Sequence, residues 1–351
     1  MSLVLHVDGD RWRAHLRTVA ESRPGLVPVA KGNGYGFGNG RLARKAQWLG
    51  CDTLAVGTYA EIPDVAQRFD GDLVVLSPWR PWGEAAEHAS DERVIHTVGR
   101  PADLQALVDA PGRPRVLLER LTSMKRHGFT ARGLREAVAA AGDGVRIEGV
   151  SLHLPLDTGD NLAEAGDLMT DVVAAGFDQL DARGSTVWIS HLGAADLSVL
   201  AAQHPRLTFR PRAGTDLWLG DRGALRVTAR VLDSHPVERG ERFGYRGRVV
   251  PRTGTLLVVS GGTAHGIGLE APTGEGSVRA RAATLARGGL DALGLVRSPY
   301  TVAGKARYFA EPPHMQSSML FLPSGVEVAV GDEVDVRVRF TATSFDAVEI
   351  A

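Results

Sequence analysis

Cysteine is nearly absent from this chain of 351 residues, which contains only Cys51. One cysteine excludes an intrachain disulfide and a cysteine-based zinc site, and we expect Cys51 to be a small buried hydrophobe. An excess of charge of one sign is also missing, because the formal net charge is -1. The sequence therefore predicts no general attraction to nucleic acid or to an anionic membrane.

Long apolar runs are missing as well. No run in the sequence approaches the roughly 20 residues that a membrane-spanning helix needs. The first residues, 1–8, lack the basic and then apolar layout of a signal peptide. We therefore expect a cytoplasmic protein with no membrane partner. Its length is sufficient for one large domain and one smaller domain.

Lysine is also scarce, because only four occur and arginine supplies the remaining positive charge. Lys31 is the most informative of them. It ends the apolar run 26–30 and opens the glycine-rich segment 31–38. Such a change places an amine at the rim of a sheet or barrel, where the backbone can approach a ligand closely. A desolvated lysine in this position suits carbonyl capture as a Schiff base.

Residues 1–222 are expected to form a (β/α)8 barrel. Short β-branched runs alternate with alanine- and arginine-rich segments that have apolar residues three or four apart, which indicates strands alternating with helices. The predicted strands are 26–31, 53–57, 73–76, 94–97, 116–119, 147–153, 187–191 and 207–210. The clearest predicted helices are 40–49, 102–109, 133–141 and 161–174.

Residues 223–351 have a different pattern. Apolar and polar residues alternate in several short runs, glycine and proline separate these runs, and long helical patterns are absent. We expect a second, mainly β domain, with which the first few residues of the chain can also pair. The predicted strands are 225–232, 254–259, 319–322 and 334–340, with a loop or weak hairpin at 270–290.

The ends of the predicted barrel strands carry polar and charged side chains. Functional side chains of a parallel barrel gather on the rim where its strands end. A lysine, two arginines and a histidine on one rim suit an anionic, conjugated ligand with a phosphate and a phenolate. In chain order these candidates are Lys31, Glu119, Arg126, His153, Ser190, His191 and Arg212, followed by a glycine turn with a hydroxyl at Gly214 and Thr215.

The segment 29–38, VAKGNGYGFG, resembles the pyridoxal-phosphate (PLP) lysine motif of alanine racemases. Further segments resemble motifs of this family in the family's order, and together they cover most of the chain. They are 124–128, 148–153, 209–214, 244–247 and 314–316. The resemblance implies a fold of barrel plus β domain, PLP as cofactor and an amino acid as substrate. It also implies racemase (isomerase) activity on alanine or another small amino acid.

The resemblance also implies roles for individual residues. Arg126 corresponds to the arginine that contacts the PLP phenolate oxygen, and His153 to the histidine that lies against the pyridine ring. Arg212 corresponds to the arginine that bonds the pyridine nitrogen. Tyr245 corresponds to a second catalytic base that serves the neighbouring subunit's site, and Met315 to a residue whose backbone lines the substrate pocket. A homodimer with shared sites follows as an expectation.

Racemisation needs two acid–base groups on opposite faces of a planar carbanion, and by resemblance these are Lys31 and Tyr245. Both must titrate below their solution pKa values of roughly 10 to work near neutral pH. Arg126 and Arg212 are expected to lower the pKa of Lys31. Arg212 can donate but cannot accept a proton, so it would keep the pyridine nitrogen unprotonated.

The chain departs from the family pattern in several places. Glu119 stands where the family has a lysine, often carbamylated, and a glutamate would supply the same negative charge to Arg126 directly. Phe37 replaces a histidine of the lysine motif. In 260–268 the tyrosine that narrows the family's access channel has no counterpart, and His265 is the candidate for that region. The substrate could therefore differ from alanine.

The phosphate-binding residues form a further departure, because the family's C-terminal tyrosine has no counterpart here. The phosphate would then depend on Tyr35, Gly214, Thr215 and Ser190, although Ser198 fits one alternative spacing for the serine.

Three other functions remain open. The chain could be a PLP racemase or epimerase of a different amino acid. It could resemble the PLP- and metal-dependent D-threonine aldolases or D-serine dehydratases, although no histidine–cysteine metal pair is evident, so no metal is predicted. It could also be a non-catalytic PLP-binding protein, although the small proteins of that kind lack the second domain and its tyrosine.

Overall fold

The computed structural model describes residues 2–156, 159–269 and 296–351. The chain divides into two compact units, one of residues 13–220 and the other of residues 1–12 with 221–351. The sequence interpretation placed residues 1–222 in the first domain and allowed its first residues to pair with the second. The predicted segment 270–290 lies outside the described residues.

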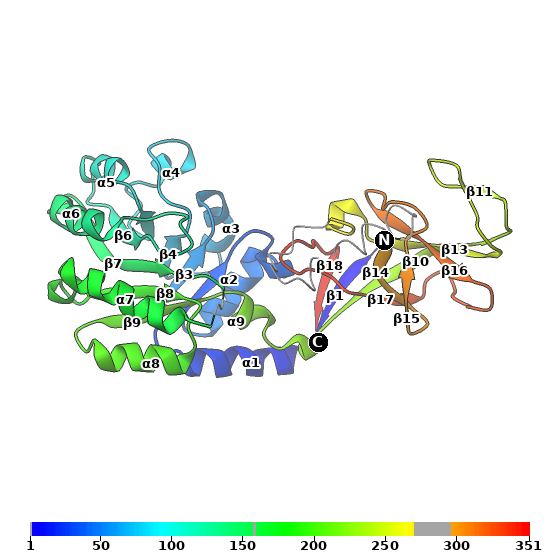
Figure 1. Cartoon of the computed structure of the whole chain (residues 1–351), viewed down its shortest axis with the longest axis horizontal. Coiled ribbons are helices and arrows are strands. Elements are labelled where there is room, and N and C mark those ends of the chain that lie inside the picture. The colour runs from blue at the N-terminus through cyan, green and yellow to red at the C-terminus, as the bar shows by residue number, and fades with distance from the viewer. Residues whose placement is uncertain (1, 157–158, 270–295) are drawn as a thin grey trace. The chain divides into compact units, whose positions relative to one another are not determined.

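The first unit contains a closed barrel of eight parallel strands, which confirms the predicted fold (Figure 1). Neighbouring strands follow chain order, and the barrel closes where Val27 of the first strand pairs with Arg212 of the last. The strands are β2 (Val27–Ala30), β3 (Thr53–Val56), β4 (Asp72–Val75), β5 (Val94–Val98), β6 (Arg115–Arg120), β7 (Arg146–His153), β8 (Thr186–Ser190) and β9 (Thr208–Ala213).

Helices alternate with the barrel strands and flank them (Figure 1). Their apolar faces recur every three or four residues, as in α6, where Leu134, Ala137 and Ala141 are buried. The helices are α1 (Gly9–Glu21), α2 (Asn39–Trp48), α3 (Ile62–Ala66), α4 (Glu84–Glu87), α5 (Pro101–Val108), α6 (Ala131–Ala141), α7 (Asn161–Ala174), α8 (Ala194–Gln203) and α9 (Thr215–Leu219). No helix in the described part of the chain is both long and apolar enough to span a membrane.

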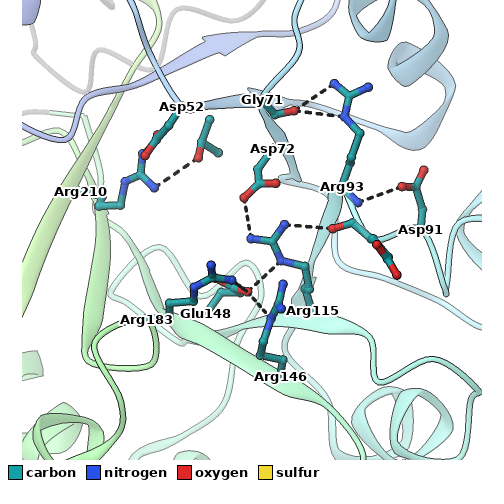
Figure 2. Close-up of polar contacts among 12 residues, drawn as sticks. Asp52, Gly71, Asp72, Asp91, Arg93, Arg115, Arg146, Glu148, Arg183 and Arg210 are labelled. Atoms are coloured by element: carbon teal, nitrogen blue, oxygen red, sulfur yellow. Dashed lines mark hydrogen bonds and ion pairs between the residues drawn. The ribbon is translucent and has the colours of Figure 1, made fainter.

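An ion-pair network lies at the end of the barrel where the strands begin (Figure 2). Arg115, the first residue of β6, donates from Nη2 to Asp72 Oδ2 at 2.6 Å and from Nε to Glu148 Oε1 at 2.8 Å. Arg146 donates to the same Glu148 oxygen at 2.7 Å. Buried charges need partners of opposite sign, and in this network the buried Arg115 and Glu148 each have them.

The second unit is mainly β, as predicted. Its strand order is β15-β14-β17-β10-β1-β18, and β13 pairs with both β10 and β16. The strands are β1 (Leu3–Val7), β10 (Leu225–Val237), β11 (Arg242–Phe243), β12 (Arg248–Val249), β13 (Gly254–Ser260), β14 (Arg297–Val302), β15 (Lys305–Tyr308), β16 (Ser317–Pro323), β17 (Glu333–Val336) and β18 (Ala347–Ile350). β1 pairs antiparallel with β10 and parallel with β18, so the start of the chain belongs to this sheet.

Candidate active site

Lys31 directly follows β2, at the rim where the parallel barrel strands end. Its side chain is exposed, but surrounding protein atoms remove part of its hydration shell. This desolvation, followed by the positive charges of Arg126 and Arg212, lowers the pKa of Lys31, whereas Glu61 opposes the shift. The amine is therefore easier to deprotonate than a lysine in water, in the direction that the sequence predicts.

Glu61 holds the backbone around Lys31 and was missed by the sequence interpretation. Its carboxylate accepts hydrogen bonds from the N–H of Gly32 at 2.7 Å and of Gly57 at 2.6 Å. It therefore ties the lysine segment to the end of β3. The segment Thr58–Glu61 matches the T-x-x-E pattern of a capping box, and this signal was available in the sequence.

Arg212 lies on β9 and is buried, with 7% of its surface exposed. Its Nη1 donates to Ser151 Oγ and its Nη2 to the Leu152 carbonyl, each at 3.1 Å. Its Nε is also buried and has no hydrogen-bond partner among the described residues. Burial lowers the pKa of Arg212 to about 10, although the charge of Glu119 opposes this shift.

Glu119 lies near the end of β6 and is 5% exposed. Burial raises its pKa, while the charges of Arg212 and Arg126 act in the opposite direction. The carboxylate is therefore buried within the electrostatic field of both arginines. The positive charges of the two arginines favour the ionised form of this buried carboxyl group, whereas its burial favours the neutral form.

His153 ends β7, and its ring Nδ1 lies 2.8 Å from the hydroxyl of Ser190, which ends β8. Thr122 donates a hydrogen bond to the His153 carbonyl at 2.7 Å. The His191 ring packs beside that of His153, with the centroids 5.1 Å apart. Burial, followed by the charges of Arg212 and Arg126, lowers the pKa of His153 to about 3. His153 is therefore neutral near pH 7.

Arg126 lies in the segment between β6 and α6 and is exposed. Its charge acts on Lys31, Glu119 and His153. The structure therefore places Arg126 within electrostatic reach of these rim residues.

Gly214 follows β9, and the side chain of Tyr35 reaches its backbone. A Cβ on Gly214 would lie 2.8 Å from Tyr35 Cζ and closer still to its hydroxyl oxygen, so any larger residue would have to displace the Tyr35 ring. Burial raises the pKa of Tyr35 to about 12, so its phenol stays protonated at neutral pH and can donate a hydrogen bond. Thr215 opens the short helix α9 beside this glycine. The Tyr35 hydroxyl thus lies against bare backbone directly before Thr215.

Tyr245 and Met315 lie in the second unit, where both are exposed. They line one groove of about 680 Å³ together with residues of the segments 311–314 and 316–317. His265 is buried instead, and its Nε2 lies 3.1 Å from Asp346 Oδ1. His265 is therefore held within the β unit by its contact with Asp346.

No cluster of three or more histidine, cysteine, aspartate or glutamate side chains suitable for a metal ion occurs in the described ranges. The rim is instead cationic and contains one buried carboxylate. This charge pattern favours an anionic ligand over a metal ion.

Comparison with known proteins identifies relatives over most of the chain. The family model for the alanine racemase N-terminal domain matches residues 7–219. The alanine racemase of Nitratidesulfovibrio vulgaris is 26% identical over 278 residues, which cover 72% of each protein.

Solved structures show the same fold across both units. The alanine racemase of E. faecalis has a TM-score of 0.70 at 19% identity and covers 99% of this chain, which covers 98% of that one. The alanine racemase of Bartonella henselae, solved with covalently bound pyridoxal phosphate, has a TM-score of 0.72 at 16% identity with full coverage of both chains. Because the family model spans more than half of the sequence, this chain belongs to the alanine racemase family.

Proposed function

We propose that the chain is a PLP-dependent amino acid racemase that acts on alanine or another small amino acid. The observation that carries this proposal is the rim of the barrel. There a lysine with a lowered pKa lies in the field of Arg126 and Arg212, and a buried glutamate opposes these charges. Such a rim can hold an anionic aldehyde covalently through Lys31.

The residues present fit PLP on two observations. Arg212 has a buried Nε–H without a partner among the described residues, so it can donate to a ring nitrogen that lies against it. Gly214 has no Cβ, which allows the Tyr35 hydroxyl to lie directly beside bare backbone at the end of β9. This bare backbone, with the hydroxyls of Tyr35, Thr215 and Ser190, is the proposed phosphate site.

Bound PLP would supply an electron sink that makes the Cα–H bond of an amino acid acidic. Lys31 would hold the cofactor and exchange a proton with one face of the substrate carbon. Arg212 would keep the ring nitrogen unprotonated, because a guanidinium donates and does not accept a proton. Neutral His153 would lie against the ring, held by Ser190.

Tyr245 is the proposed second acid–base group and would exchange a proton with the opposite face of the substrate carbon. Arg126 and the backbone of Met315 would contact the substrate. We further propose that the protein is a homodimer in which Tyr245 serves the partner's site, as the resemblance of 244–247 to the family's second-base segment implies.

The cofactor is tested by an absorbance scan of the protein purified with PLP. We expect a visible band in the unchanged chain and in Lys305→Ala, whose lysine is exposed on β15. Lys31→Ala should lose the band. No visible band in the unchanged chain would refute both the racemase and a PLP carrier.

Activity is tested with a panel of L-amino acids followed by chiral separation. Tyr245→Phe should keep the visible band and lose racemisation, because the cofactor site on the barrel is intact while the second base is missing. Cofactor binding without racemisation of any amino acid would favour a non-catalytic PLP-binding protein. Racemisation of another amino acid but not alanine would identify a different substrate.

The shared site is tested by mixing Lys31→Ala with Tyr245→Phe and allowing the chains to exchange. If Tyr245 acts in the partner's site, each mixed dimer has one intact site and activity returns to about a quarter of the unchanged level. If Tyr245 acts within its own chain, every site in the mixture lacks one base and no activity returns.

A further inference from the structure

The loop that carries Tyr245 lies against a histidine from a distant part of the sequence. This loop joins β11 to β12, and 87% of Tyr245 is exposed. The Tyr245 ring packs beside that of His314, with centroids 4.7 Å apart and planes tilted by 57°. An exposed phenol on a short loop has several rotamers of similar energy, so a ring at this distance restricts where its hydroxyl can point.

Glu311 joins the histidine to the tyrosine loop. Its Oε1 lies 2.7 Å from His314 Nε2, and its Oε2 accepts a hydrogen bond from the backbone N–H of Tyr245 at 3.1 Å. The Glu311 side chain is only 2% exposed. A Cβ on Gly244 would lie within 2.8 Å of Glu311, so this glycine allows the carboxylate to approach the loop.

We propose that His314, oriented by Glu311, is a positioning residue that holds the phenol of Tyr245 for proton transfer. This inference rests on the proposed function, in which Tyr245 is the second base. The buried Glu311 carboxylate holds both the backbone of Tyr245 and the His314 ring, so the two rings keep a fixed distance and tilt. Neither contact involves the barrel, so cofactor binding should not depend on them.

Four variants separate the contributions. His314→Gln keeps a hydrogen bond to Glu311 but removes the ring, whereas His314→Phe keeps a ring beside Tyr245 but loses the hydrogen bond. Glu311→Gln retains an acceptor oxygen without the charge. His235→Gln is the matched control, because His235 also faces a carboxylate, that of Asp233 at 3.3 Å, in the same unit.

In the kinetic arm we expect His314→Gln to lower kcat about 10- to 100-fold with KM changed less than about twofold, because a small misplacement of a reacting group slows the chemical step. With substrate deuterated at Cα, the primary isotope effect should rise only for the enantiomer whose Cα hydrogen Tyr245 removes. His314→Phe should recover part of the rate, and His235→Gln should match the unchanged chain. Because the equilibrium constant of racemisation is one, kcat/KM must fall equally in both directions. An unchanged kcat, or an isotope effect that rises equally in both directions, would overturn the proposal.

A second arm does not depend on activity or cofactor. The chain has five tyrosines, which can be labelled as 3-fluorotyrosine, and Tyr245→Phe assigns one fluorine resonance. His314→Gln and Glu311→Gln should shift or broaden that resonance, whereas His235→Gln should leave it in place. A resonance unaffected by the first two changes would refute the positioning. If the unchanged chain racemises no amino acid, the proposed function fails and this arm alone decides the contact.

Discussion

Replacement of Gly214 by alanine tests how the barrel forms the proposed phosphate site. The new Cβ would lie 2.8 Å from Tyr35 Cζ and nearer to its hydroxyl oxygen. Tyr35 is 5% exposed, so its ring has little free space into which it can withdraw. The phenol must move by roughly 1 Å to restore ordinary van der Waals separation.

Overpacking of this kind costs about 1–3 kcal/mol in a tightly packed interior. For a unit of this size each kcal/mol lowers Tm by about 2–4 °C, so we expect a decrease of about 2–12 °C. Displacement of the Tyr35 hydroxyl should also weaken PLP binding by about tenfold, which corresponds to about 1.4 kcal/mol.

The measurement is a double-mutant cycle that compares Gly214→Ala, Tyr35→Phe and the double variant with the unchanged chain. Thermal unfolding gives the stability of each protein, and titration with PLP, monitored by the visible band, gives its affinity for the cofactor. Removal of the hydroxyl relieves the closest contact, so Gly214→Ala should cost at least about 0.5 kcal/mol less in a chain that already carries Tyr35→Phe. Additive costs would refute the proposed clash. Gly166→Ala is the control, because among the described residues nothing beyond its own helix backbone lies within 4 Å of its Cβ, and alanine favours a helix.

Three further predictions follow from the barrel. Arg115→Met should lower the free energy of unfolding by about 3 kcal/mol in urea titrations, because Glu148 loses a buried partner and retains only Arg146 at hydrogen-bond distance. The visible PLP band should remain intact. Unchanged stability would contradict this prediction. As the pH falls, the His153 imidazole takes up a proton near pH 6.5 in the unfolded chain but only near pH 3 in the folded chain, so the folded state loses stability between these values. His153→Gln should reduce this loss. Urea titrations across this range that match the unchanged chain would argue against it. Arg212→Lys keeps the positive charge but loses the planar guanidinium with its several N–H donors, so PLP should dissociate at least about tenfold faster during dialysis. Retention of PLP equal to that of the unchanged chain would count against a role of Arg212 in binding the cofactor.

The strands of the barrel could be predicted because parallel strands buried on both faces form short, almost continuous apolar runs. The segment 53–57 became β3 (Thr53–Val56), and 161–174 became α7 with the same bounds. β9 was predicted to end at residue 210 but continues to Ala213. Pro211 lies within this strand and weakens its sequence signal, because proline removes a backbone donor.

Long-range contacts at the sites could not be predicted in the same way. Glu61 reaches the N–H of Gly32 only because β2 and β3 are neighbours in the barrel. His314 meets Tyr245 only because Glu311 binds both. The signals for these contacts are single residues far apart in the chain, and periodicity does not relate them.

The sequence by itself determined the class of fold, the position of Lys31 at the end of the first barrel strand and the order of the segments that resemble alanine racemases. These features depend on local composition and on the spacing of motifs along the chain. Only the tertiary structure decided how far the rim side chains are desolvated, and this is the largest cause of the lowered pKa of Lys31 and of His153. It alone also placed a histidine and a buried carboxylate beside Tyr245, since such contacts arise when separate strands and loops pack together.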